Sequence, residues 1–117
     1  MTRLAIVGSR TFNDYDLLID TLSRFSEAPR QFDTLISGGA KGADSIGERW
    51  ATSWGIEIVR YLPEWKKYGK SAGFIRNQTI VDNCDMVLAF WDGKSSGTAD
   101  TIEKAKKAKK PTFIIYV

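Results

Sequence analysis

Short apolar segments alternate along this chain with longer segments in which apolar residues recur every three or four positions. The short segments predict β-strands, and they lie at residues 4–7, 34–37, 57–61, 85–90 and 112–116. The longer segments predict helices between these strands. Because helical crossovers join neighbouring parallel strands, this alternation predicts a mainly parallel sheet with helices on both faces.

The helical segments have recognisable faces and ends. The first predicted helix has Asn13 or Asp14 as its N-cap and an apolar face made by Leu17, Leu18, Leu22 and Phe25. The second has a face made by Ala43, Ile46, Gly47, Trp50, Ala51 and Trp54. Core or oligomer packing is therefore expected of Trp50 and Trp54, and Gly55 is expected to end the helix. A third helix is predicted over residues 71–83, and a fourth from residues 97–98 to the lysines before Pro111.

These elements predict one Rossmann-like domain over residues 1–117, a three-layer α/β/α sandwich with a five-stranded sheet. We expect the strand order 3-2-1-4-5, which places the topological switch point between the first and fourth strands. In such sheets, ligands bind in the crevice beyond the carboxyl ends of the strands.

Composition narrows the chemistry. The 117 residues include one cysteine, Cys84, and no histidine, so an internal disulfide and histidine-based catalytic triads are excluded, and no metal is predicted. No apolar run approaches the roughly 20 residues of a membrane span, and we expect a cytoplasmic protein that contacts no membrane. Neither the Walker pattern nor the G-x-G-x-x-G pattern occurs, and no cofactor is predicted.

The net charge of +3 depends on one segment near the end of the fourth predicted helix. It contains five lysines, Lys104, Lys106, Lys107, Lys109 and Lys110. Cations at a helix C-terminus complement the helix dipole and keep the surface solvated. A polyanion-binding patch is the alternative interpretation.

Glycine and polar residues follow three of the predicted strands, at residues 8–12, 37–44 and 91–98. Glycines let the backbone approach a ligand closely, and N–H groups at a helix start attract anions. The three loops meet at one sheet edge and predict a ligand site made of Gly8, Ser9, Arg10, Gly38, Gly39, Lys41, Gly42, Asp44, Asp92, Gly93, Ser95, Ser96, Gly97 and Thr98.

Several of these residues have two interpretations. Arg10 is suited to a phosphate or carboxylate, or else makes a surface ion pair. Asp44 accepts bonds from ribose hydroxyls, or else caps the second helix. The hydroxyls of Ser95, Ser96 and Thr98 bind an anion, or else cap the fourth helix.

Residues 63–73 place aromatic residues and three lysines before the third helix, and we expect a lid or rim loop there. Trp65 and Tyr68 would stack on a base, and Arg76 and Asn77 would reach phosphate or sugar. Alternatively, these aromatic rings close the edge of the core or a subunit contact.

Residues 8–10, 37–44, 76–77 and 91–98 resemble, in order and spacing, the small YspA/YpsA-like branch of the SLOG superfamily, named after the SMF/DprA and LOG proteins. The resemblance covers nearly the whole chain. It implies a Rossmann-like fold, recognition of nucleotides or nucleotide-derived molecules, links to NAD or ADP-ribose metabolism, and a homo-oligomer, dimer or tetramer.

LOG members are phosphoribohydrolases that cleave the N-glycosidic bond of a nucleoside monophosphate, and their catalytic glutamate follows the loop after the fourth strand. This chain has Thr101 at that position. Since glycosidic hydrolysis normally uses a carboxyl group, Asp92 is the first catalytic candidate and Asp44 the second, with Asp100 as a further carboxylate.

Three functions are compatible with these features. The first is a sensor, carrier or sequestering protein for a nucleotide-derived ligand. The second is a LOG-like phosphoribohydrolase. The third is a single-stranded nucleic-acid binder resembling DprA, with Lys66, Lys67, Lys70 and the lysines of residues 104–110 along the backbone, and it is the least favoured.

Overall fold

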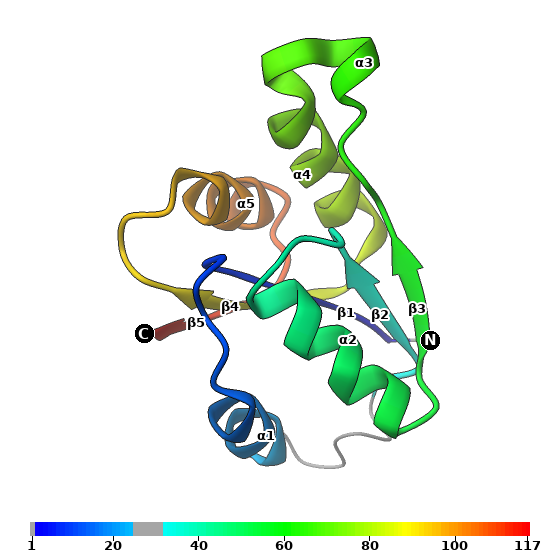
Figure 1. Cartoon of the computed structure of the whole chain (residues 1–117), viewed down its shortest axis with the longest axis vertical. Coiled ribbons are helices and arrows are strands. Elements are labelled where there is room, and N and C mark those ends of the chain that lie inside the picture. Colours follow the sequence, from blue (N-terminus) through cyan, green and yellow to red (C-terminus); the bar gives the residue numbers. More distant parts are fainter. Residues whose placement is uncertain (1, 25–31) are drawn as a thin grey trace.

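The computed structural model describes residues 2–24 and 32–117, whose strands form one sheet with helices on both faces (Figure 1). The strands are β1 (Arg3–Gly8), β2 (Thr34–Ser37), β3 (Glu57–Arg60), β4 (Met86–Trp91) and β5 (Thr112–Tyr116). The helices are α1 (Tyr15–Ser23), α2 (Ala43–Ser53), α3 (Trp65–Tyr68), α4 (Ala72–Asn83) and α5 (Ser96–Lys107), with a 3-10 turn η1 (Gly69–Ser71). Phe25, expected on the first helix, lies outside the described residues.

All strand pairs are parallel, and the order β3-β2-β1-β4-β5 confirms the predicted topology. The central strand β1 is buried on both faces because alternate side chains point to opposite sides. Leu4 and Ile6 pack with α1 and α2, whereas Ala5 and Val7 pack with α4 and α5. The switch point lies between β1 and β4, as expected.

Asp14 is the N-cap of α1, and its Oδ1 accepts the N–H of Leu17 at 3.0 Å. In α2, Trp50 is buried in the core, with its ring edge-on to that of Phe32 at 6.4 Å. The expected core packing of Trp54 is wrong, since 59% of this residue is exposed. Trp54 is the C-cap, one position beyond the last residue of α2, so the helical spacing that placed it on the apolar face does not extend to it.

Residues 63–73 were expected to form a loop, but they contain α3 and η1. A single helical turn forms because Lys67 and Tyr68 both donate their N–H groups to the carbonyl of Glu64, at 3.1 and 3.0 Å. This turn projects beyond the amino end of α4 (Figure 1), and it has no buried residue.

Three lysines of the predicted cationic segment have partners within the fold. Lys104 pairs with Asp100 at 2.5 Å and Lys107 with Glu103 at 3.1 Å. Lys110 donates to the carbonyl of Cys84 at 2.7 Å. Among residues 2–24 and 32–117, no helix combines the length and apolar character needed to cross a membrane.

Candidate functional site

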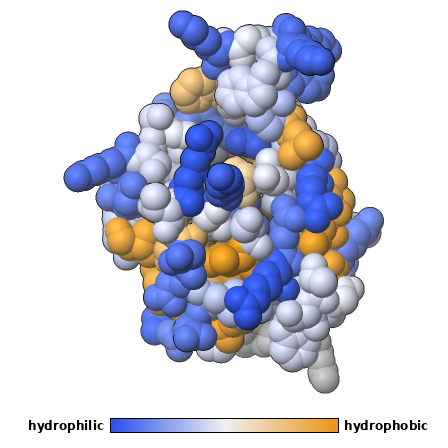
Figure 2. Space-filling view, in the orientation of Figure 1, coloured by the Kyte–Doolittle hydropathy of each residue, from blue (hydrophilic) through white to orange (hydrophobic). Residues whose placement is uncertain are grey.

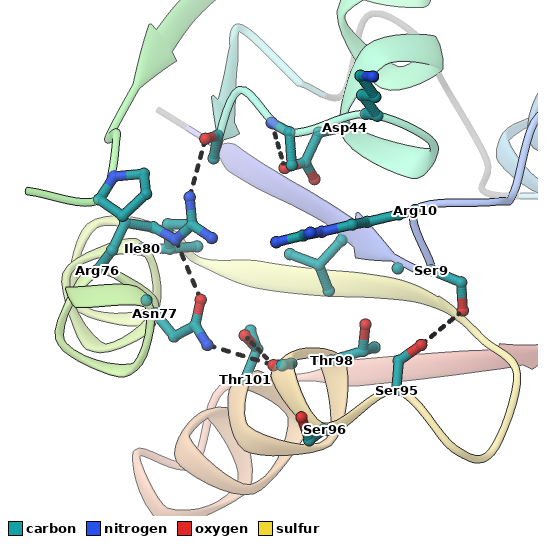
Figure 3. Close-up of a pocket in the computed structure, with 18 of the residues that line it drawn as sticks. Ser9, Arg10, Asp44, Arg76, Asn77, Ile80, Ser95, Ser96, Thr98 and Thr101 are labelled. Atoms are coloured by element: carbon teal, nitrogen blue, oxygen red, sulfur yellow. Dashed lines mark hydrogen bonds between the residues drawn. The ribbon is translucent and has the colours of Figure 1, made fainter. Parts of the chain in front are cut away.

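A pocket of about 860 Å³ opens at the carboxyl ends of β1, β2 and β4 (Figure 3). In Figure 2, hydrophilic side chains project over the middle of this face of the molecule. The pocket brings together fifteen of the predicted site residues: Gly8, Ser9, Arg10, Gly38, Gly39, Lys41, Asp44, Trp65, Arg76, Asn77, Asp92, Ser95, Ser96, Gly97 and Thr98. Gly42 and Gly93 do not line it.

The loop after β2 is held in place by side chains. The carbonyl of Gly38 accepts a hydrogen bond from Arg76 Nη1 at 2.8 Å. The N–H of Gly39 donates to Ser37 Oγ at 3.1 Å, and the N–H of Ala40 donates to Asp44 Oδ2 at 3.1 Å. Two amides of the glycine-rich segment are therefore already bound to protein groups, so this loop offers fewer free donors than its sequence predicts.

Gly42 has a structural role behind the pocket. Its φ is +79°, and a Cβ at this position would overlap the backbone oxygens of Ser9 and Arg10. The loop after β1 can therefore pass directly against the start of α2, where Ala43 donates its N–H to the carbonyl of Ser9 at 3.3 Å.

Two guanidinium groups face the same space. Arg76 is half-buried, and its Nε donates to Asn77 Oδ1 at 3.1 Å. Arg10 is exposed and extends across the pocket toward Arg76 (Figure 3). Burial lowers the pKa of Arg76, Asp44 opposes this effect, and the charge of Arg10 adds to it. In the described part of the chain, neither arginine makes a salt bridge with a carboxylate, so their charges remain available to an anion.

Asp44 is a buried carboxyl group in the lining of the pocket. It is 7% exposed, and burial raises its pKa from 3.8 to about 6, although the N–H of Ala40 and the charge of Arg76 both act to lower it. The N-cap of α2 is Gly42, and Asp44 turns its carboxyl toward the loop after β2 instead of capping the helix. Its contact with ribose remains a prediction.

Asp92 holds the loop after β4. Its Oδ1 accepts the N–H groups of Lys94 and Ser95 at 2.8 and 2.7 Å, and its Oδ2 accepts Ser95 Oγ at 3.1 Å. The two backbone hydrogen bonds are the main cause of the lowered pKa of Asp92. This carboxylate is therefore suited to fixing the loop and poorly suited to donating a proton.

The hydroxyls and amides beside Asp92 face the pocket. Ser9 Oγ lies 3.3 Å from Ser95 Oγ and accepts the N–H of Asp92 at 3.3 Å. At the start of α5, the N–H groups of Ser96, Gly97 and Thr98 have no acceptor among residues 2–24 and 32–117. Free N–H groups at a helix start favour an anion. Ser95 makes no side-chain capping hydrogen bond to α5, and binding of an anion by these residues remains a prediction.

Asn77 links the two helices on this side of the sheet. Its Nδ2 donates to the carbonyl of Gly97 at 3.2 Å and to Asp100 Oδ2 at 3.1 Å, while its Oδ1 accepts from Arg76. All of these contacts are within the protein. Asn77 therefore positions Arg76 and the start of α5 and has little capacity left for a ligand.

Some lining residues were not predicted individually. Thr11, Ala40, Pro63, Lys70 and Gly73 lie in segments predicted to surround the site, whereas Val7, Leu62, Phe74, Ile80 and Thr101 lie outside those segments. Leu62 and Pro63 follow β3, which ends at the same sheet edge as β1, β2 and β4. That position was the signal available in the sequence. Leu62, Trp65 and Phe74 form an apolar rim, and each is about half exposed or more. Among the described residues, no cluster of three or more acidic, cysteine or histidine side chains is arranged to hold a metal ion.

The comparisons with known proteins agree with this architecture. Residues 2–68 match the YAcAr family, described as the YspA, cpYpsA-related SLOG family. The chain belongs to this SLOG family. It is also similar to the Gene 61 protein of Mycobacterium phage D29, with 39% identity over 125 residues, 97% of this chain and 95% of the phage protein.

Solved structures share the SLOG fold at low sequence identity. DprA from Streptococcus pneumoniae has a TM-score of 0.77 and 19% identity, covering 100% of this chain and 51% of DprA. DprA from Helicobacter pylori, whose structure concerns single-stranded DNA binding, has a TM-score of 0.74 and 22% identity over 97% and 64% of the two chains. The protein TM1055 has a TM-score of 0.71 and 20% identity over 96% and 72%.

Proposed function

We propose that this SLOG protein binds a nucleotide or nucleotide-derived ligand, such as ADP-ribose, an NAD-like compound or a nucleoside monophosphate, and acts as a sensor, carrier or sequestering protein. The observation that carries this proposal is the pair Arg10 and Arg76, which face one pocket without a carboxylate partner in the described ranges. Like charges that face each other repel, and a bound phosphate removes that cost.

The ligand's phosphate would lie between the two guanidinium groups and the free N–H groups that begin α5. Asp44 would accept a ribose hydroxyl. The apolar rim of Leu62, Trp65 and Phe74 would take the base. The volume of about 860 Å³ falls within the range of small-molecule pockets.

The test is to incubate the protein with AMP, ADP, ADP-ribose, cyclic ADP-ribose, NAD and cytokinin-type ribotides, and to identify bound and free compounds by mass spectrometry. Retention of one intact compound supports the proposal. Arg10→Ala is then expected to lose about 2–3 kcal/mol of binding free energy, as a charge-assisted contact is removed. Arg24→Ala is the control, because Arg24 pairs with Asp20 on the surface. Equal affinity of wild type and Arg10→Ala would place the anion elsewhere.

A second candidate is a phosphoribohydrolase that releases the base by hydrolysis of the N-glycosidic bond. Asp44 favours it, because a carboxyl group with a pKa of about 6 can exchange a proton near neutral pH. Disappearance of a compound with release of free base and ribose phosphate would support this activity. Asp44→Asn should then abolish turnover while binding is kept. Asp92→Asn, in the same assay, tests the carboxylate that the sequence ranked first as a catalytic residue.

Binding of single-stranded nucleic acid is the third candidate, supported by the DprA likeness and the exposed Lys66, Lys67 and Lys70. Oligonucleotide affinity that falls steeply with salt would support it.

The protein is also proposed to form a homo-oligomer, either a dimer or a tetramer. Measurement of its molar mass by light scattering tests this proposal.

A further inference from the structure

A chain of hydrogen bonds runs beneath the pocket from the edge strand β3 to Arg76. It begins at Arg60, whose Nε and Nη2 lie 2.8 and 2.6 Å from Glu48 Oε1. Glu48 Oε2 accepts the hydroxyl of Ser37 at 2.7 Å. Ser37 Oγ in turn accepts the N–H of Gly39 at 3.1 Å.

One peptide group joins this chain to the pocket. The carbonyl of Gly38 and the N–H of Gly39 belong to the same planar unit, so they cannot turn independently. Ser37 holds the N–H end of that unit, while Arg76 Nη1 donates to its carbonyl end at 2.8 Å. Rotation of this peptide would break both bonds together.

Between Arg76 and Glu48, the hydrogen bonds of this chain all run in one direction, and burial shields them from water. Ser37 is 1% exposed, and the Glu48 side chain is 17% exposed, so water offers these groups little competition. Because the Ser37 hydroxyl donates its proton to Glu48, its lone pairs face the N–H of Gly39. Each bond polarises the next toward the Arg76 guanidinium.

We propose that Glu48 is a positioning residue for Arg76, acting through Ser37 and the Gly38–Gly39 peptide. Glu48 does not line the pocket, so it touches no ligand there. Its effect on ligand affinity rests on the proposed function. Its effect on the loop and on Arg76 does not depend on any ligand.

The experiment compares Glu48→Ala, Glu48→Gln, Ser37→Ala and Arg60→Ala with the wild type. The ligand-free readout is the NMR resonance of the Gly39 N–H and of the Arg76 Nε–H. We expect Glu48→Ala and Ser37→Ala to shift both resonances and to speed their hydrogen exchange about tenfold or more. Glu48→Gln keeps an acceptor for Ser37 and should restore most of the wild-type signal.

Arg60→Ala separates the positioning role of Glu48 from its ion pair with Arg60. Both Arg60→Ala and Glu48→Ala break the salt bridge, but Arg60→Ala leaves Glu48 in place to accept the Ser37 hydroxyl. Both resonances should stay near their wild-type positions in Arg60→Ala. Equal disturbance by Arg60→Ala and Glu48→Ala would overturn the proposal. So would unchanged resonances in Glu48→Ala. If Glu48→Ala fails to fold, Glu48→Met removes the acceptor of Ser37 while keeping most of the side-chain volume, and it is read in the same way.

Affinity for AMP is the second readout. We expect about a tenfold weaker affinity in Glu48→Ala and in Ser37→Ala, with no further loss when both are combined, since residues that act through one another are not additive. Additive losses would contradict the route through Ser37. Failure of the wild type to bind AMP would count against the proposed function, and the two resonances would still decide the role of Glu48.

Discussion

Replacing Asp44 by asparagine removes a carboxyl group that the fold holds in a poorly solvated place. The asparagine side chain would keep the shape of the native one and an oxygen for the N–H of Ala40, but it would carry no charge at any pH. The variant therefore tests how strongly burial opposes ionisation of the native residue.

The magnitude follows from the pKa. In the unfolded chain Asp44 titrates near 3.8, and in the fold near 6. Between these values the folded state binds more protons, so the contribution of Asp44 to stability falls as pH rises through this window. A change of this size corresponds to about 3 kcal/mol. Asp44→Asn should therefore be more stable than the wild type at pH 7 by up to about 3 kcal/mol, and the difference should shrink toward pH 4.

The assay is urea unfolding of both proteins at several pH values between 4 and 7.5. Comparison at each pH cancels the opposite contributions of Asp85 and Asp92, whose pKa values are lowered by hydrogen bonds. A difference that stays constant with pH, or an Asp44→Asn variant less stable than the wild type at pH 7, would refute the reasoning. A stabilised variant would mean that the fold retains an unfavourable charge in its pocket, as functional groups often require.

Three further predictions concern other parts of the molecule. Gly42→Ala should lower the free energy of unfolding by about 2 kcal/mol or more, and Gly55→Ala by only about 1 kcal/mol, as measured by urea unfolding. Both glycines have positive φ, but only at Gly42 would the added Cβ overlap backbone atoms. Trp50→Ala should cost about 3–5 kcal/mol and the exposed Trp54→Ala less than about 1, measured by thermal unfolding. Arg76→Lys should weaken AMP binding by about 1.5–3 kcal/mol in calorimetry, since one ammonium cannot reproduce the guanidinium contacts; unchanged affinity would contradict this.

The strands and their order could be predicted because hydrophobic period and right-handed crossovers act locally and leave few topologies. The same logic brought the loops after β1, β2 and β4 together. The sequence did not predict which side chains become buried at the ends of the helices. The pattern placed Trp54 on an apolar face, but the helix ends one residue before it.

The site shows the same limit at finer scale. The sequence ranked Asp92 above Asp44 as a catalytic carboxylate, and the surroundings of the two groups favour the reverse order. Asp44 is buried and hard to ionise, whereas Asp92 is surrounded by N–H groups that keep it charged. Glu48 could not be identified from the sequence, because its proposed positioning role depends on a contact with Ser37, eleven positions away.

The pairing of β1 with β4 has a consequence for synthesis of the chain. Arg3 donates its N–H to Asp85, 82 positions later, and the five paired positions of β1 and β4 form the middle of the sheet. A ribosome therefore releases β1 long before its central neighbour exists, and contacts of such separation form slowly. The loops that carry Arg10 and Ser95 meet only when this pairing is complete. A ligand held between them would bind the finished fold alone, so its cellular concentration would help to set how much of the newly made protein remains folded.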